Sequence, residues 1–395
     1  MIYSITIILL VSILLTSASL AADDTSAQES IVDWVRENGG HFSRKQEFRR
    51  AIPGDTTSHF GIFAKENIQK GELLTRVPWK CIITRKNMEE DKRNPYFFCG
   101  STRMLIDEIK KGEESFFAPY TAYLKSQPRG KIPSDWSAPG KDLLNEVLGE
   151  DALPPDYATG LIDFWQHSCA YQGAQIGPLE QQALVEYHSR ADDQFLIPLY
   201  DLYNHAQDEM SNGSIGVFKG DKQELRATRA ISRGEEIAFS YNFATHQDSW
   251  TKKYYGTSEF LRDFGFVESF PQRWVFDEDS FRFDLKKDAD GEIELTWLSE
   301  PDKEYFDFIR EQLERLRFGV KPILEDIEKQ VQNGLVAGKV PADLPLPAEM
   351  KTIRQYFDSL KSAMEAAIKS EHEVNPTDDD VNDDNDDDDD DNDEL

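Results

Sequence analysis

Hydrophobic and polar positions follow different periods along the chain and divide it into four blocks. The first block, residues 30–85, opens with IVDWV (31–35), whose apolar spacing predicts a short helix ending at Gly39-Gly40. Three extended runs bounded by turn residues follow and predict strands: EFRRAI (47–52), HFGIFA (59–64) and ELLTRV (72–77). We therefore expect this block to be rich in β-structure.

The remaining blocks alternate between helical and extended patterns. Helical periodicity marks STRMLIDEIKKG, SFFAPYTAYLKS, KDLLNEVLG and DYATGLIDFWQHSCAYQ within residues 95–190. Short strands are expected within 195–298, at SIGVFKG, ELRATRAI and EEIAFSY, and helices dominate again from 301 to 370. A β-rich core interrupted by helices and followed by a mostly helical domain (276–372) is an α+β architecture.

The two ends of the chain resemble targeting signals. Residues 5–15, ITIILLVSILL, have the length and apolarity of a signal-peptide core, and Ser19-Leu20-Ala21 offers a cleavage site, which gives a signal peptide over 1–21. An uncleaved membrane anchor is the alternative interpretation. After cleavage we expect no stable membrane insertion, because no other stretch approaches eighteen apolar residues.

The C-terminal segment, 373–395, is acidic, of low complexity and expected to be disordered. It ends in Asn-Asp-Glu-Leu, which resembles the retrieval signals of the endoplasmic reticulum and suggests a retrieval receptor as partner. The two signals agree on the lumen of the endoplasmic reticulum or the secretory pathway. The sequon Asn212-Gly213-Ser214 lies in a turn-rich segment, so we expect glycosylation of Asn212.

Charge and cysteine content exclude several classes of function. The formal net charge is −30, of which the 12 Asp and one Glu between residues 378 and 394 supply −13. The rest of the chain is also acidic and would repel phosphate backbones, so we expect no nucleic-acid partner. The widely spaced Cys81, Cys99 and Cys169 fit neither a structural zinc site nor a disulfide scaffold, and we expect no metal.

Three separated segments carry side chains suited to binding or catalysis. The first is the strand 60–64 with its glycine, the second is the apolar run 197–202 with the three residues after it, and the third spans 231–241. Alone, each is also typical of ordinary packed structure. The residues of interest are Gly61, Ile62 and Phe63 in the first segment, Tyr203, Asn204 and His205 in the second, and Phe239 and Tyr241 in the third.

In this order, the three segments resemble a SET-domain methyltransferase of the class of Rubisco large-subunit lysine methyltransferase and actin-histidine methyltransferase. Supporting motifs are Trp34 with Gly39-Gly40, SFFAPY (115–120) and EFLRDFGF (259–266). The resemblance spans residues 31–274 and implies a β-rich pseudoknotted core over 30–275 with a helical insertion at about 95–190. The chain departs from the family by having His59 where the first motif usually has glycine, and Phe264 where tyrosine is frequent.

The resemblance implies S-adenosyl-L-methionine as cofactor and a protein side chain as methyl acceptor, lysine first and histidine second. Gly61, Ile62 and Phe63 would line the cofactor with their main chain, and Asn204 and His205 would hold its amino-acid and adenine portions. Tyr241 would be the catalytic tyrosine, preferred to Tyr254 and Tyr255 because it follows Gly234 at the family's spacing. Tyr203, Phe239 and Phe264 would form the walls of the acceptor pocket.

Three hypotheses of function remain open at this point. The first is an active protein N-methyltransferase. The second is a SET-fold binding module without catalysis in the secretory pathway, which His59 favours. The third assigns the function to the acidic tail, as a low-affinity calcium buffer built of clustered carboxylates, against the simpler interpretation of a solubilising spacer.

Overall fold

The computed structural model describes residues 24–55, 58–84, 97–149, 152–170, 177–192, 195–207, 210–216, 222–241, 255–277, 281–299 and 301–371. The expected signal peptide, the acidic tail with its terminal tetrapeptide, and Tyr254 all lie outside these ranges. None of the helices within them is long and apolar enough to cross a membrane.

The N-terminal part consists of one helix and short antiparallel strands. Helix α1 (Ser26–Glu37) contains the predicted IVDWV, and the chain turns after it at Gly39, whose φ is +90°. The expected strands appear as β2 (Gln46–Arg50), β3 (Phe60–Ala64) and β4 (Leu73–Pro78), preceded by β1 (His41–Phe42). Strands β2 and β3 form a hairpin, whereas β4 lies between β1 and β7 (Lys222–Ala227) in a sheet of order β1-β4-β7-β6, with β6 at Gly213–Ile215.

Helices fill most of the next stretch, as its periodicity predicts. They are α3 (Phe97–Lys111), α4 (Ala118–Ser126), α5 (Ala138–Leu148), α6 (Leu161–Ala170) and α7 (Pro178–His188). A 3-10 turn (Tyr200–Leu202) then leads into β5 (Asn204–His205), which pairs in parallel with β8 (Ala238–Phe239). Strand-like elements and helices thus alternate as the α+β prediction requires.

The C-terminal part begins earlier than expected and contains a sheet. After α8 (Thr257–Phe264), strands β9 (Gln272–Asp277), β10 (Phe281–Lys287) and β11 (Ile293–Trp297) form an antiparallel sheet of order β11-β10-β9. The expected boundary at residue 275 falls inside β9. Helices follow as predicted: α9 (Lys303–Glu314), a π-helical turn (Arg315–Val320), α10 (Lys321–Val336) and α11 (Pro347–Lys369).

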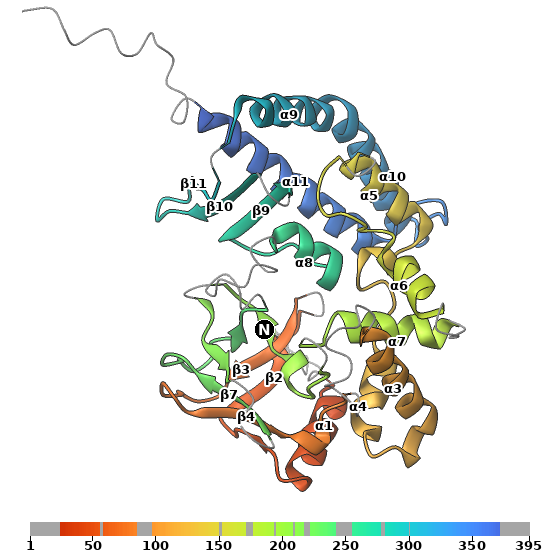
Figure 1. The fold of residues 1–395 in the computed structure, drawn as a ribbon, viewed down its shortest axis with the longest axis vertical. Helices are drawn as coiled ribbons and strands as arrows, with labels where there is room; N and C mark the ends of the chain where they lie inside the picture. The colour runs from red at the N-terminus through yellow and green to blue at the C-terminus, as the bar shows by residue number, and fades with distance from the viewer. Residues whose placement is uncertain are drawn as a thin grey trace, which may run out of the picture.

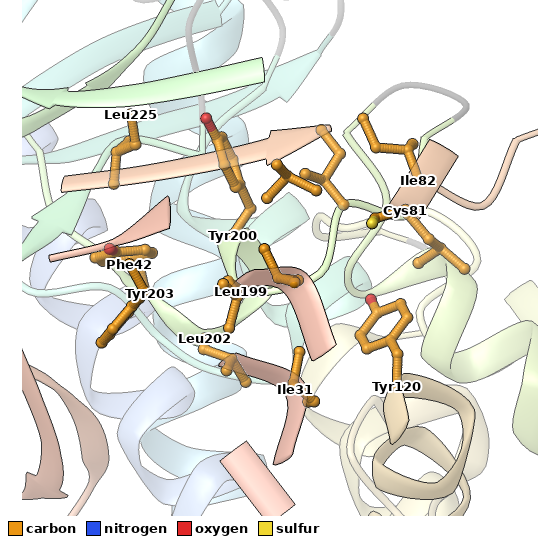
Figure 2. Packing of buried hydrophobic residues seen from close by; sticks show 14 of the residues in the cluster. Ile31, Phe42, Cys81, Ile82, Tyr120, Leu199, Tyr200, Leu202, Tyr203 and Leu225 are labelled. Carbon is orange, nitrogen blue, oxygen red and sulfur yellow. The ribbon is translucent and has the colours of Figure 1, made fainter. Parts of the chain in front are cut away.

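The residues that the structure describes form two large hydrophobic cores and a small cluster of Ile132, Ile162 and Val185. The first packs α1, the small strands and α3, α4 and α7, and includes Ile31, Tyr120, Leu199 and Tyr203 (Figure 2). The second packs the sheet β9–β11 against α11 and α9 (Figure 1). Helix α5 belongs to the second core although it lies within the expected insertion. It packs on α11, where Glu349 accepts hydrogen bonds from the backbone N and the hydroxyl of Ser137 at 2.7 and 2.6 Å.

Candidate active site

The segments around Asn204-His205 and Tyr241 meet through the parallel pair β5–β8, in which Asn204 lies opposite Ala238 and His205 opposite Phe239. Tyr241 follows β8 and is tied back to the β5 segment twice. Its backbone N–H donates to Nδ1 of His205 at 3.0 Å, and its hydroxyl donates to the main-chain oxygen of Tyr203 at 2.6 Å. Residues separated by more than thirty positions are therefore held as one unit.

This unit borders a cavity of about 1090 Å³, a volume sufficient for a nucleoside-sized ligand and part of a second molecule. Of the residues predicted from the sequence, Asn204, His205, Phe239, Tyr241 and Phe264 all line it. The cavity thus brings together the second and third sequence segments and the EFLRDFGF motif.

Aromatic rings surround Tyr241. The centroids of the Phe264 and Phe239 rings lie 5.0 and 5.5 Å from that of Tyr241. Burial raises the pKa of the Tyr241 hydroxyl above its usual value, so the group stays protonated at neutral pH. A fixed, protonated hydroxyl in an apolar wall can orient a nitrogen nucleophile and direct its dipole at a reacting group.

Asn204 is held by its amide hydrogens. Its Nδ2 donates to the main-chain oxygen of Phe60 at 2.9 Å and to Oε1 of Glu236 at 2.7 Å. Both bonds cross directly over Gly61, where an added Cβ would lie 2.6 Å from Nδ2 and 2.5 Å from the Glu236 oxygen. The glycine of the first segment is therefore needed because the Asn204 amide occupies the space of a side chain.

His205 uses both ring nitrogens within the protein. Because the Tyr241 backbone N–H can only donate, Nδ1 accepts, and the ring proton lies on Nε2, which contacts Glu268 Oε2 at 3.2 Å. Glu268 is buried and also accepts from the Thr257 hydroxyl at 2.6 Å. The imidazole of His205 therefore positions Tyr241 and lines the cavity with its ring.

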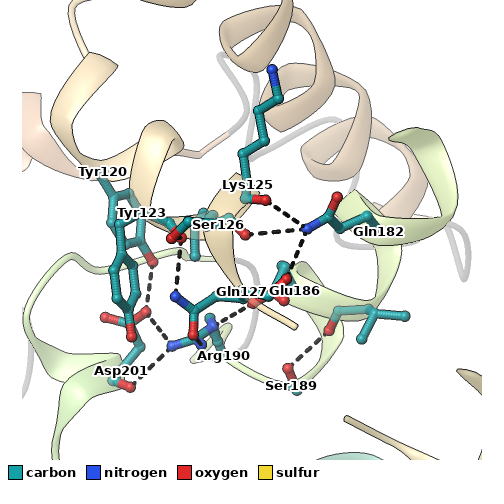
Figure 3. Close-up of polar contacts among 12 residues, drawn as sticks. Tyr120, Tyr123, Lys125, Ser126, Gln127, Gln182, Glu186, Ser189, Arg190 and Asp201 are labelled. Carbon is teal, nitrogen blue, oxygen red and sulfur yellow. Dashed lines mark hydrogen bonds and ion pairs between the residues drawn. The ribbon is translucent and has the colours of Figure 1, made fainter. Parts of the chain in front are cut away.

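A buried ionic network forms another part of the cavity wall (Figure 3). The guanidinium of Arg190 contacts Glu186 Oε2 at 2.6 Å and Asp201 Oδ2 at 2.9 Å, and the Tyr120 hydroxyl donates to the same Asp201 oxygen at 3.1 Å. Burial raises the pKa of the Asp201 carboxyl, and Arg190 opposes this shift. The other oxygen of Asp201, Oδ1, is buried without a hydrogen-bond partner among the residues that the structure describes.

Lys131 also lines the cavity, within electrostatic reach of Arg190, Glu186 and Asp201. Burial, reinforced by the positive charge of Arg190, lowers the pKa of its amine to about 7. Its backbone is fixed against Gly265, whose φ is +77° and where a Cβ would collide with the Lys131 carbonyl oxygen. This contact places Lys131 next to the Phe264 turn.

The rival tyrosine Tyr255 lies elsewhere. Its hydroxyl donates to Asp263 Oδ2 at 2.9 Å, and that carboxylate also binds His188 and Arg262. Tyr255 does not belong to the cavity lining, and Tyr254 is outside the described residues. The geometry therefore agrees with the preference for Tyr241 over Tyr255.

One predicted pocket residue, Tyr203, does not lie where the sequence analysis put it, whereas the predicted main-chain role of Gly61, Ile62 and Phe63 stays a prediction. Tyr203 is fully buried in the first core, and its hydroxyl bonds Thr75 and Gln46, so its side chain is not a pocket wall. Ile62 and Phe63 are also buried, and the cavity is lined by the residues just before Gly61, His59 and Phe60. The first segment thus contributes side chains to the cavity lining from its beginning, at His59 and Phe60.

The expected glycosylation site is also wrong for the folded chain. Asn212 is only 1% exposed. Its Nδ2 donates to the main-chain oxygen of Glu236 at 2.7 Å, and its Oδ1 accepts from the backbone N of Ala238 at 3.0 Å. The Asn212 side chain thus binds the backbone at β8 and is not exposed for attachment of a glycan.

Several functional candidates were not singled out from the sequence, namely Glu236, Glu268, Lys131, Arg190 and Asp201. Asp201 had a visible signal, because it is a charged residue inside the apolar run LIPLYDL, where burial requires a partner. Glu236 stands within the third segment beside Gly234. Glu268, Arg190 and Lys131 have no comparable signal, since their neighbours along the chain are polar or mixed.

Comparison with known proteins agrees with this geometry. A family model described as the SET domain matches residues 59–242. The chain therefore contains a SET domain, with the α+β fold class that the sequence predicts.

The SET domain of LSMT bound to lysine and AdoHcy is similar in structure, with a TM-score of 0.49 and 12% identity over 89% of this chain and 93% of that one. Rubisco LSMT bound to AdoMet gives a TM-score of 0.49 and 14% identity over 87% of this chain and 92% of that one. No curated protein matches the chain.

Proposed function

We propose that the protein is an S-adenosylmethionine-dependent protein N-methyltransferase that modifies a lysine side chain, with histidine as the second choice of acceptor. One observation carries the proposal. The parallel pair β5–β8 brings Asn204, His205 and the Tyr241 hydroxyl to one cavity inside a SET domain. The LSMT structures, described as bound to lysine and AdoHcy or to AdoMet, are in keeping with it.

The residues of the cavity fit the cofactor. The Oδ1 of Asn204 makes no hydrogen bond within the described residues, and Arg50 lies on the same cavity lining, so an acceptor and a cationic group are present for the amino-acid portion. The rings of Phe239, Phe264 and Phe266 offer apolar surface. When bound, S-adenosylmethionine would supply a methyl group on a sulfonium for in-line attack by a neutral nitrogen, with S-adenosylhomocysteine as the leaving group.

This chain's own residues then position the acceptor. The Tyr241 hydroxyl is anchored on the Tyr203 carbonyl and faces an aromatic wall that excludes water. An acceptor oxygen and a dipole fixed in advance are felt more strongly in the transition state than in the ground state, which raises turnover more than affinity.

The direct test is methyl transfer from labelled S-adenosylmethionine to proteins of a lysate, read by mass spectrometry of the modified residues. Tyr241→Phe keeps the ring, so folding should change little while turnover falls by about 10²-fold or more, an effect of the size seen for loss of one preorganised polar group. Tyr255→Phe is the matched control and should stay within a few-fold of the parent. The reverse pattern would refute the assignment of Tyr241.

A catalytically inactive binding module is the second candidate, because His59 replaces a glycine that the first motif usually carries. Calorimetry with S-adenosylhomocysteine separates it from the first. Binding together with methyl transfer supports the enzyme. A folded protein that transfers no methyl group to any protein tested supports the module.

We also propose residence in the lumen of the endoplasmic reticulum. The signal-like ends motivate this proposal, and the disulfide formed by Cys99 supports it, because disulfides persist in oxidising compartments. Cys81 is free and buried. A fluorescent reporter inserted in the acidic tail, with both ends left native, should give a reticular pattern, whereas nuclear or cytosolic fluorescence would contradict the proposal.

A further inference from the structure

The segment after α8 places a buried carboxyl group at the cavity. Glu268 is only 5% exposed, and it lies on the cavity lining together with Phe264 and Phe266 of the EFLRDFGF motif. Burial of such a group is costly unless its oxygens find partners inside the protein. The partners of the two Glu268 oxygens therefore indicate what this side chain does.

The two oxygens of Glu268 serve different parts of the fold. Oε1 accepts a hydrogen bond from the hydroxyl of Thr257, the first residue of α8, at 2.6 Å. Oε2 contacts Nε2 of His205 and accepts from Nε2 of Gln207, both at 3.2 Å. One oxygen is thus anchored to α8, and the other holds two side chains of the β5 segment.

Each of these two side chains leads on to the end of the β8 segment. The backbone N–H of Tyr241 donates to Nδ1 of His205 at 3.0 Å, and the hydroxyl of Ser240 donates to Oε1 of Gln207 at 3.1 Å. Tyr241 lies two residues beyond β8, where the pairing of β8 with β5 has ended. A single oxygen of Glu268 therefore holds two consecutive residues at the end of this segment through two separate side chains.

The link through His205 depends on which ring nitrogen carries the proton. In a neutral imidazole, the hydrogen bond at one nitrogen decides the role of the other. Because Gln207 donates to Oε2 of Glu268, this oxygen is an acceptor and favours the proton on Nε2 of His205. The opposite tautomer would set the N–H of Nδ1 against the backbone N–H of Tyr241. Glu268 therefore keeps Nδ1 free to accept.

We propose that Glu268 is a positioning residue for Tyr241, which it holds in place by fixing the tautomer of His205 and the side chain of Gln207. This inference rests on the proposed function, because the position of Tyr241 matters for turnover only if its hydroxyl acts on an acceptor. Glu268 lies 63 positions after His205 and beyond the residues 59–242 that the SET-domain model matches. The segment after the SET match thus completes the site.

The tautomer of His205 gives a test that does not depend on activity. Nitrogen NMR of the isotope-labelled imidazoles in the full chain distinguishes the protonated from the bare ring nitrogen, and the signals missing in His205→Gln identify this ring among the seven histidines. We expect the proton on Nε2 in the parent. In Glu268→Leu the acceptor at Nε2 is lost, so we expect signals of the other tautomer.

Turnover should follow the tautomer. In Glu268→Leu we expect methyl transfer at saturating S-adenosylmethionine to fall by about 10- to 100-fold, as for displacement of a reacting group by about 1 Å. The affinity for S-adenosylhomocysteine, measured by calorimetry, should stay within a few-fold. Glu268→Gln should restore both tautomer and turnover, because its amide oxygen can replace Oε2 while its nitrogen donates to the Thr257 hydroxyl.

The matched control is Thr257→Val, which removes the partner of Oε1 and leaves both contacts of Oε2. It should keep the parent's tautomer and stay within a few-fold of its turnover. Equal losses in Thr257→Val and Glu268→Leu would overturn the proposal, because Glu268 would then only support the cavity wall. A proton on Nδ1 of His205 in the parent would overturn it without any variant, as would unchanged turnover in Glu268→Leu. If the parent transfers no methyl group, the proposed function fails and the positioning role with it, whichever tautomer the spectrum shows.

Discussion

The two cores of the molecule differ in what they bury. The second core is filled by rings and branched side chains such as Trp274, Phe281, Phe283 and Phe357, all at most 1% exposed. Its polar groups include the Tyr356 hydroxyl, which is paired with the Ser258 hydroxyl inside the protein. The first core instead adjoins a cavity whose lining includes the buried pair Arg190 and Asp201, and Arg190 is also paired with the buried Glu186.

This contrast separates stability from function. A core made of packed rings gains free energy from every buried surface and has no group that needs a ligand. A core that keeps charges next to a cavity pays a desolvation cost and retains groups suited to binding. Substitutions in the second core should therefore change stability alone, and those in the first should change stability, ligand affinity or both.

The largest effect is expected for Arg190→Met. Removing the guanidinium leaves Asp201 and Glu186 buried without their partner, which should cost about 3–5 kcal/mol of unfolding free energy. Urea unfolding followed by circular dichroism measures it. The exposed Arg310→Met, which loses contacts to Asp307 and Glu371, should cost less than about 1 kcal/mol. Similar losses of unfolding free energy in the two variants would contradict the distinction between the cores.

Lys131→Met should raise the unfolding free energy rather than lower it. Burial lowers the pKa of the folded-state amine from 10.5 to about 7, so folding disfavours its charged form. The unfolded chain binds more protons between those values, and the parent's stability should therefore rise with pH from about 7 toward 10. The variant should gain on the order of 2 kcal/mol at pH 7, because part of the side chain reaches solvent, and the gain should vanish near pH 10.5. A gain that does not depend on pH would contradict the argument.

Asn204→Ala tests the binding side of the first core. The variant loses the hydrogen bonds to Glu236 and Phe60 and the free Oδ1, so S-adenosylhomocysteine should bind more weakly by about 1–3 kcal/mol. Calorimetry measures the affinity, and circular dichroism checks the fold. Unchanged affinity in a folded variant would argue against the role of this motif.

Ile353→Val gives the smallest effect and completes the comparison. Ile353 lies on α11 and is fully buried in the second core. Loss of one methylene should lower the unfolding free energy by about 0.5–1.5 kcal/mol. Affinity for S-adenosylhomocysteine should stay at the parent's value, and any weakening would show that the second core also shapes the cavity.

Local patterns predicted local structure well. The helical period and the glycines after it placed α1, and the apolar period placed α9 and α11, because those signals depend on neighbours three or four positions away. The sequence motifs also predicted the meeting of Asn204-His205 with Tyr241, although only through resemblance to a family. Spacing alone contains no information about which strands pair.

Contacts between residues that are distant in the sequence explain the features that the sequence analysis did not predict. The face of Tyr203 is decided by Thr75 and Gln46, which are 128 and 157 positions away. Asn212 is buried because β8 needs its amide, although its neighbours resemble an exposed turn. The partner of His59 is likewise remote in the sequence, because it is Glu236, 177 positions later.

Helix α5 has a consequence for how the chain is made. Its capping residue Ser137 binds Glu349, which lies 212 positions further along. A ribosome adds about 5–20 residues per second, so this helix should wait roughly 10–40 s after its own synthesis before α11 emerges to cover it. During that interval the apolar face of α5, which includes Leu143, Leu144 and Val147, is not packed against α11. We therefore expect chaperones to bind this helix on nascent chains until the last segment has been translated.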